Sequence, residues 1–153
     1  MGLWLRKATW EDMDLLYQWA NDAEVRKNAF HMEKIPYEDH KKWFGKVMED
    51  ERIYQYILCD DDVFIGQIRL NVEGDTAWID YSICSDKRGL GYGSTMLSLM
   101  EQQLAVDKIS YSYIAKLAGQ VKYRNAASAK AFEKCGYEKK ELAEYIEYTK
   151  LLM

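Results

Sequence analysis

The chain has 153 residues, of which 48% are hydrophobic and 14% aromatic, and it carries a formal net charge of −4. This length fits one domain over residues 1–153, and the composition is typical of a folded globular protein, which excludes a disordered chain. The acidic balance gives no field that would attract nucleic acid, and no run approaches the ~20 apolar residues that a membrane span needs, so we expect neither partner.

The amino terminus, the cysteines and the histidines indicate the compartment. The opening sequence MGLWLRKATW lacks the apolar core of a signal peptide. Cys59, Cys84 and Cys135 are odd in number, lie in apolar contexts and have no metal-type spacing. Neither His31 nor His40 has a partner ligand at a suitable spacing. We therefore expect a reduced, cytoplasmic location and no metal site.

The first third of the chain is expected to form one strand and two helices. Residues 3–7 alternate as a strand, and Thr9 with Asp12 three residues later forms a capping box that begins a helix. Residues 36–50, opened by the only proline, carry apolar side chains at helical spacing. The charged segment 21–36 between these helices is expected to be a loop or a broken helix.

Strands are expected next. Residues 53–59 and 63–72 form a hairpin around the acidic turn 60–62, and the turn 71–76 leads to a further strand over residues 77–84. Because strands and helices interleave along the chain, the order predicts a mixed α+β sheet with helices on both faces.

A glycine-rich turn and a helix follow that strand. Gly89, Gly91 and Gly93 alternate, so amide N–H groups can line the concave side of the turn. The helix begins near Gly91 and carries four apolar side chains on one face, at Met96, Leu97, Met100 and Leu104. Its positive end and the loop amides point at one place, which predicts a phosphate site.

Spacing narrows the kind of phosphate site. The turn has no Gly-Lys-Ser/Thr, which excludes the Walker pattern, and Ser94 or Met96 stands where a dinucleotide-binding loop needs its third glycine. Three alternating glycines between a strand and a helix can also be a plain tight connection.

The last third of the chain contributes a strand, a helix and two closing runs. Residues 109–121 are apolar enough for a central strand, in which Gly119 suggests a bulge or a close backbone approach. A helix follows from Asn125, and Gly136 is placed to end it in the left-handed conformation. Residues 137–153 give two more runs with strand character.

Two motifs carry a resemblance to a known family. Arg88-x-x-Gly91-x-Gly93 resembles the R/Q-x-x-G-x-G/A signature of the GNAT superfamily of N-acetyltransferases. Residues 125–137, NAASAKAFEKCGY, resemble that family's N-x-x-S-x-x-x-Y/F-E-K-x-G-F/Y helix, although a short amphipathic helix would also fit. The resemblance implies a single N-acetyltransferase domain with a seven-stranded, mostly antiparallel sheet that splays between its fourth and fifth strands.

The resemblance also implies acetyl-coenzyme A as co-substrate, bound in the splay. The residues expected to contact it lie in the fourth strand, the glycine-rich turn and the second motif: Ile83, Cys84, Arg88, Gly89, Leu90, Gly91, Tyr92, Gly93, Ser94, Asn125, Ser128 and Phe132.

Two catalytic side chains that are common in the family are replaced in this chain. Phe132 stands where many relatives carry a tyrosine acid, and Gln120 stands where many carry a glutamate that helps to activate the amine. Asp80 is the best remaining carboxylate, although a solvated surface aspartate is an equal alternative, and Tyr137, near the expected thioester, is the candidate acid. Tyr81 and Tyr123 carry further hydroxyls in that region.

The acceptor is narrowed only by a weaker resemblance. The run ATWEDMDLLYQWANDAEVRKNAF is similar to amino-sugar nucleotide N-acetyltransferases of the pseudaminic-acid type, which implies substrate contacts from Arg26, Phe30 and His31. Protein N-terminal or polyamine acetylation remains open, as does a coenzyme A binding module without turnover. We expect a small amine-bearing partner and a monomer or homodimer.

Overall fold

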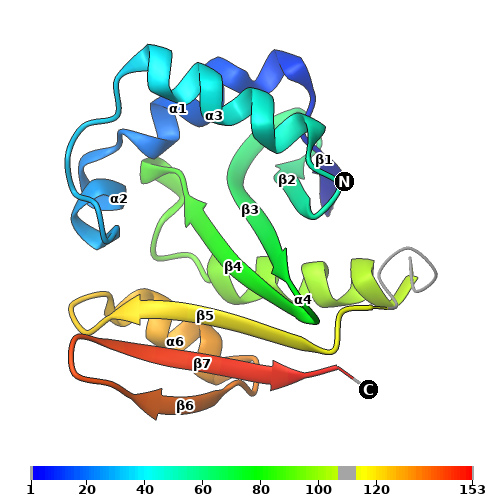
Figure 1. Ribbon diagram of the computed structural model, residues 1–153, viewed down its shortest axis with the longest axis vertical. Helices are drawn as coiled ribbons and strands as arrows, with labels where there is room; N and C mark the ends of the chain where they lie inside the picture. The colour runs from blue at the N-terminus through cyan, green and yellow to red at the C-terminus, as the bar shows by residue number, and fades with distance from the viewer. Residues whose placement is uncertain (1, 107–112, 153) are drawn as a thin grey trace.

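A computed structural model describes residues 2–106 and 113–152 and contains a seven-stranded sheet (Figure 1). Its order is β1-β2-β3-β4-β5-β7-β6. The strands are β1 Leu3–Lys7, β2 Ile53–Asp60, β3 Val63–Glu73, β4 Thr76–Ile83, β5 Lys116–Lys122, β6 Glu138–Glu141 and β7 Tyr145–Leu151. Neighbouring strands pair antiparallel except β4 and β5, which are parallel. The predicted mixed, mostly antiparallel fold is confirmed.

The sheet opens between β4 and β5. The two strands pair only over Thr76–Trp78 and Lys116–Ala118. Beyond that seam β4 continues along β3 and β5 continues along β7, so the two arrows diverge (Figure 1). This is the splay that the resemblance implied, and it leaves the backbone at the end of β4 without a strand partner on one side.

Helices cover both faces of the sheet. They are α1 Met13–Ala20, α2 Ala23–Asn28, α3 Tyr37–Glu49, α4 Tyr92–Val106 and α6 Ala126–Lys134. On one face α1 and α3 pack against β2 in a cluster formed by Leu16, Phe44, Ile57 and Cys59. On the other face α4 and α6 pack against the sheet in the larger cluster, which includes Met96, Met100, Phe132, Tyr56 and Ile68.

Local signals in the sequence account for several element ends. The capping box forms, because the amide of Thr9 donates to Asp12 Oδ2 at 2.7 Å, although the helix first makes a 3₁₀ turn over Trp10–Asp12. Gly136 ends α6 with φ of 84°, as expected. The segment between α1 and α3 is interrupted by the short α2, which fits a broken helix.

The expected strand over residues 109–121 is shorter in the structure. β5 begins at Lys116, three residues after the described chain resumes, and residues 109–112 lie outside the described part. The apolar pattern therefore overestimated the strand, because Ile114 is buried as part of the connection that leads into it.

Gly119 makes a close backbone approach to α6. A Cβ built on this residue would lie 2.5 Å from Cζ of Phe132, while the pairing of β5 with β7 continues without a shift. The Phe132 ring is 1% exposed, stacks on Tyr148 at 5.2 Å between ring centroids, and meets Tyr137 edge-on at 4.9 Å. The ring therefore fixes α6 against β5, and its tip has no space for a hydroxyl without rearrangement.

The described residues contain neither a membrane-spanning helix nor a cluster of metal-ligand side chains. No helix among them is long and apolar enough to cross a membrane. No three His, Cys, Asp or Glu side chains in residues 2–106 and 113–152 gather as metal ligands.

Candidate active site

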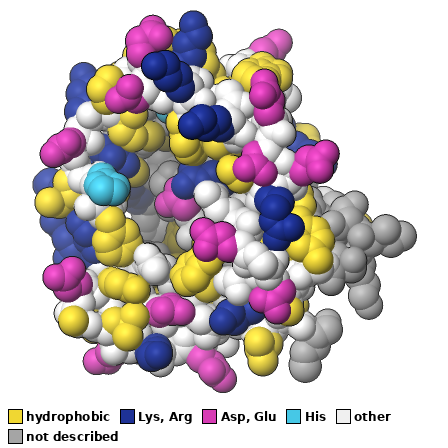
Figure 2. Space-filling view, in the orientation of Figure 1, with side chains coloured by type: hydrophobic (Ala, Val, Ile, Leu, Met, Phe, Trp, Pro, Cys, Tyr) yellow, Lys and Arg dark blue, Asp and Glu magenta, His cyan; other side chains and the backbone are white. Residues whose placement is uncertain are grey.

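A cavity of about 970 Å³ occupies the splay. Residues from α1, α2 and α3 line one end, residues from the glycine-rich turn and α6 line the other, and strands β2 to β5 form the floor. Figure 2 shows a hollow on the face in view, with side chains of both charges at its rim. The cavity is large enough for an extended ligand that joins the two ends.

The glycine-rich turn forms an anion cradle at one end of this cavity. Gly89 and Gly91 have φ of 77° and 85°, a conformation that glycine adopts without strain, and nothing lies within 4 Å of a Cβ at either position. The helix α4 begins at Tyr92, directly after the turn, and the first N–H groups of a helix have no partner within it. The turn therefore offers backbone donors and the positive end of a helix dipole to a phosphate.

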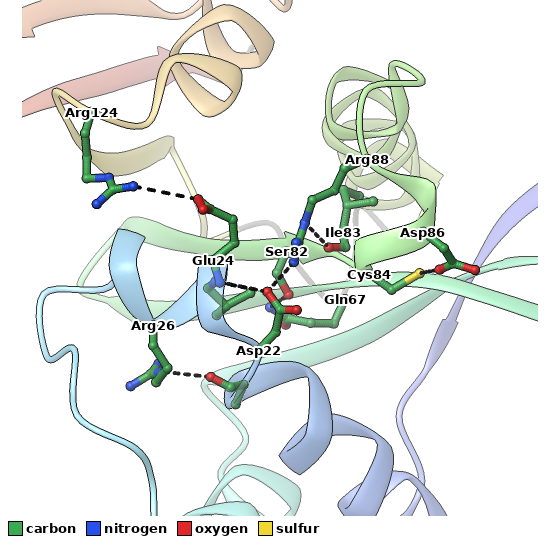
Figure 3. Close-up of polar contacts among 12 residues, drawn as sticks. Asp22, Glu24, Arg26, Gln67, Ser82, Ile83, Cys84, Asp86, Arg88 and Arg124 are labelled. Carbon is green, nitrogen blue, oxygen red and sulfur yellow. Dashed lines mark hydrogen bonds and ion pairs between the residues drawn. The ribbon is translucent and has the colours of Figure 1, made fainter.

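Arg88, the first residue of the signature, is engaged by the protein itself. Its Nη2 donates to Asp22 Oδ2 at 2.6 Å and its Nε donates to the carbonyl oxygen of Ile83 at 3.1 Å (Figure 3). Burial alone would raise the pKa of Asp22, but the hydrogen bonds from Arg88 and from two backbone amides hold it below its usual value. The glycine-rich turn is thus joined to the segment that begins α2.

The floor of the cavity contains a buried polar row. Gln55 on β2 donates from Nε2 to Gln67 Oε1 at 2.8 Å, and Gln67 on β3 donates from Nε2 to Ser82 Oγ at 3.2 Å. All three residues line the cavity, and both glutamines are less than 10% exposed. The floor is therefore polar where three strands would otherwise present an apolar surface.

Asp80 lies beside this row, on β4. Its carboxylate is 59% exposed and forms an ion pair with Arg69 at 3.1 Å across the β3–β4 pairing. Arg69 also lies over the ring of Trp43, with its guanidinium carbon 4.9 Å from the ring centroid. Asp80 is thus held in place while one side stays open to the cavity.

The end of the cavity that α1, α2 and α3 line is acidic and aromatic. The carboxylates of Glu24, Asp39 and Asp80 line it together with the rings of Trp19 and Trp43.

His40 belongs to the same wall and is neutral. Its Nε2 lies 2.8 Å from the carbonyl oxygen of Met13, and burial lowers the pKa of its imidazole. The imidazole therefore adds no positive charge to the acidic wall.

Tyr81 presents a hydroxyl on the α6 side of the cavity. The hydroxyl is hydrogen-bonded to the side chain of Ser128, and the ring meets Phe132 edge-on at 5.8 Å between centroids. Burial raises the pKa of Tyr81 to about 12. Among Tyr81, Tyr123 and Tyr137, only Tyr81 lines the cavity.

The structure brings most of the expected site residues to the cavity. The lining includes twelve of them: Arg26, Asp80, Ile83, Arg88, Gly89, Gly91, Tyr92, Gly93, Ser94, Asn125, Ser128 and Phe132. Five others do not line it: Phe30, His31, Cys84, Leu90 and Tyr137.

Tyr137, expected as an acid, lies in the core. It is 5% exposed, its hydroxyl has no hydrogen-bond partner among the described residues, and burial raises its pKa. Phe132 lies between Tyr81 and Tyr137, with a ring contact to each. The geometry gives no support to a catalytic role for Tyr137.

The expected acceptor contacts are used for internal packing. Phe30 meets Tyr145 edge-on at 5.6 Å and lies under Lys122 Nζ at 5.9 Å. Arg26 donates to the backbone oxygens of Ala20 at 2.7 Å and His31 at 2.8 Å. These contacts brace the loop after α2.

Comparisons with known proteins agree with this geometry. A family model described as an acetyltransferase (GNAT) domain matches residues 2–138. No curated protein matches the chain in a sequence search.

Solved structures share the fold at low identity. The aminoglycoside acetyltransferase AAC(6′)-Ib, in complex with ribostamycin and coenzyme A, is 19% identical with a TM-score of 0.83, over 99% of this chain and 94% of that one. Spermidine N-acetyltransferase from Vibrio cholerae, in complex with coenzyme A and spermine, is 17% identical with a TM-score of 0.80, over 97% and 95%. An acetyltransferase from Salmonella typhimurium that modifies the N-terminal serine of ribosomal protein L7/L12 is 18% identical with a TM-score of 0.79, over 99% and 95%.

These structures do not support the narrower resemblance to amino-sugar nucleotide acetyltransferases, because none of the acceptors that they name is of that kind. The family model, in contrast, spans most of the sequence. The chain is therefore a member of the GNAT family of acetyltransferases.

Proposed function

We propose that this N-acetyltransferase moves an acetyl group from acetyl-coenzyme A to a primary amine of a small cationic acceptor. The acidic and aromatic end of the cavity carries this proposal, because Glu24, Asp39 and Asp80 line it beside two tryptophan rings. Carboxylates attract an ammonium group, and aromatic faces stabilise cations by cation–π contact. Arg26, Arg69 and Arg124 also line the cavity, and each of them already has a protein partner.

The co-substrate is proposed to bind along the splay. The amides of residues 88–94 would hold its pyrophosphate, and the unpaired edge of β4 near Ile83 would pair with its pantetheine arm. Asn125 caps α6 by accepting from the amide of Ser128 at 3.2 Å, which keeps this helix beside the arm. Acetyl-coenzyme A supplies an activated acyl group, whose carbonyl carbon accepts the amine.

Asp80 is proposed to remove a proton from the acceptor ammonium. The free amine can then form its C–N bond with the acyl carbon as the C–S bond breaks, and the nitrogen gives up its second proton to the departing thiolate, directly or through a neighbouring hydroxyl, as the amide forms. The departing thiolate takes up one proton, and Tyr81 is the hydroxyl that lines the cavity on the side of α6. Its raised pKa, about 12, keeps this hydroxyl protonated at neutral pH, and the modest basicity of a thiolate limits how much help the step needs.

An amino-sugar nucleotide is the alternative acceptor. Such a ligand needs cations for its diphosphate, and the sequence assigned Arg26, Phe30 and His31 to it. Because Phe30 and His31 do not line the cavity, the geometry favours a cationic amine instead.

An amine panel with acetyl-coenzyme A tests the function. The panel contains spermidine, kanamycin, a peptide that begins with serine, and an amino-sugar nucleotide, and acetylated products are identified by mass spectrometry. We expect turnover with a cationic amine and none with the nucleotide. Preferred turnover of the nucleotide or the peptide would refute the acceptor class. No turnover together with tight coenzyme A binding would favour a binding module.

The placement of acetyl-coenzyme A needs a separate control. Gly91→Val forces a β-branched side chain into φ of 85°, which should abolish binding in calorimetry while circular dichroism stays unchanged. Gly45→Val, in the middle of α3, changes the same residue type far from the turn and should leave coenzyme A affinity unaltered. Equal affinity in both variants would exclude the turn as the binding site.

A further inference from the structure

Helix α2 is an unusual wall for a binding site because it has no buried side chain. It contains only six residues, too few for a helix to be stable without outside contacts. Its residues Glu24, Val25, Arg26 and Asn28 nevertheless line the cavity. Because Val25, Arg26 and Asn28 are only half-buried, the position of this wall depends in large part on the polar contacts that reach α2 from the rest of the protein.

These contacts come from both sides of the splay, and Figure 3 shows those that Arg88 and Arg124 make. From the end of β5, Lys122 Nζ donates to the carbonyl oxygen of Lys27 at 3.3 Å, and just beyond it Arg124 lies 3.9 Å from a carboxylate oxygen of Glu24. Residues 88–94, where we place the co-substrate, are called the cofactor turn below. From this turn, Arg88 lies 2.6 Å from Asp22. The contact from the turn is the shortest of the three, and its two side chains are more buried than those of the Arg124–Glu24 pair.

Asp22 is the N-cap residue of α2. Its Oδ2 accepts from the amides of Glu24 at 3.1 Å and Val25 at 3.2 Å, and the same oxygen accepts from Arg88. Since one carboxylate oxygen serves the first turn of the helix and the arginine together, a shift of Arg88 must move or loosen the helix start.

The other edge of the Arg88 guanidinium is held by β4. Its Nε donates to the carbonyl oxygen of Ile83, the last residue of β4, and Gly89 and Gly91 follow in the turn. A ligand that orders this turn therefore also orders Arg88. No long-range rearrangement is needed, because a single side chain spans the distance from the turn to α2.

We propose that Arg88 is a positioning residue that couples the cofactor turn to α2, so that filling the turn slows the opening of the acceptor wall. The coupling rests on the proposed placement of acetyl-coenzyme A at residues 88–94. By linkage it is reciprocal, so an acceptor that holds α2 in place also tightens co-substrate binding.

Hydrogen–deuterium exchange of residues 23–28 measures the coupling, with coenzyme A as the probe. In the parent protein we expect coenzyme A to slow this exchange by about tenfold. Asp22→Asn keeps a good N-cap and removes the charge, and Arg88→Gln installs the other residue that the signature allows. In each single variant the slowing by coenzyme A should shrink to less than about threefold. The double variant should lose no more of the slowing than either single variant, because both substitutions break the same contact.

Arg124→Gln is the matched control. It removes a second arginine that pairs with α2 but lies outside the cofactor turn. It should speed exchange equally with and without coenzyme A, so that the ratio of the two rates stays as in the parent. A residue that only stabilised α2 would behave in this way, so an unchanged ratio in Arg88→Gln would refute the coupling.

Calorimetry on the same samples separates this inference from the proposed function. Absence of coenzyme A binding to the parent protein would overturn the placement of the co-substrate, and the coupling with it. Binding that Arg88→Gln weakens more than about tenfold while Asp22→Asn does not would make Arg88 a phosphate ligand and refute the coupling. Faster exchange of α2 on binding would show that the anion draws Arg88 away from Asp22, which also refutes it.

Discussion

Gly119→Ala should destabilise the protein far more than an alanine substitution usually does in a strand. The new methyl would lie 2.5 Å from Cζ of Phe132, whereas carbon atoms pack at about 3.5 to 4.0 Å, so the ring must move by about 1 Å. Tyr148 stacks on one face of that ring and Tyr137 meets it edge-on, so no empty space receives it. Overpacking of this kind costs about 1 to 3 kcal/mol in the free energy of unfolding.

Urea denaturation followed by tryptophan fluorescence measures this cost as a lower midpoint at constant m-value. Gly45→Ala is the control, because nothing lies within 4 Å of its Cβ and it sits inside α3, where alanine should stabilise by about 0.5 to 1 kcal/mol. In a double-mutant cycle, Gly119→Ala should cost at least about 1 kcal/mol less in a Phe132→Leu background than in the parent, since the shorter side chain leaves room for the methyl. A Gly119→Ala variant within about 0.5 kcal/mol of the parent, or no recovery in the pair, would disprove the close approach.

Three further outcomes follow from the site. Asp80→Asn should lower kcat by about 100-fold with acetyl-coenzyme A affinity near normal, and a rate within about threefold of the parent would leave Asp80 a structural residue. Tyr81→Phe should lower kcat about tenfold if the hydroxyl protonates the thiolate, and because its pKa is about 12 the parent enzyme should show no alkaline loss from this group below pH 10; unchanged kcat in the variant would exclude the role. Burial lowers the pKa of His40, so the unfolded chain binds the proton more readily than the folded protein does. The free energy of unfolding should therefore fall as pH drops below 6.5. His40→Gln should make this dependence on pH less steep, because the proton uptake on unfolding falls by up to one proton.

Local chemistry explains why much of this molecule could be predicted from its sequence. The turn with Gly89 and Gly91 requires positive φ values that only glycine adopts easily, and the helix behind it follows from apolar periodicity. Gly119 was expected to mark a bulge or a close approach, and the tip of the Phe132 ring shows it to be the approach. Each of these signals lies within a few residues of the feature that it predicts.

Features that depend on distant residues could not be predicted. Arg88 and Asp22 are 66 positions apart, and neither residue signals its partner. Tyr137 is the last residue of the second family motif but is buried in the core, because the motif predicts the helix and not the direction of the side chain that comes after it. Gln55 and Gln67 interrupt two apolar strands, and this signal of a buried polar pair was available in the sequence.

The absence of buried side chains in α2 has an evolutionary consequence. Substitutions at exposed positions usually change stability by less than about 0.5 kcal/mol, so Ala23, Glu24 and Lys27 in the proposed acceptor wall can vary without loss of the fold. The glycine-rich turn lacks this freedom, since Gly89 and Gly91 occupy φ values that other residues rarely adopt. If the acceptor and the acyl donor bind as proposed, mutation can explore new acceptors on one side of the splay while the acyl-donor side stays constant.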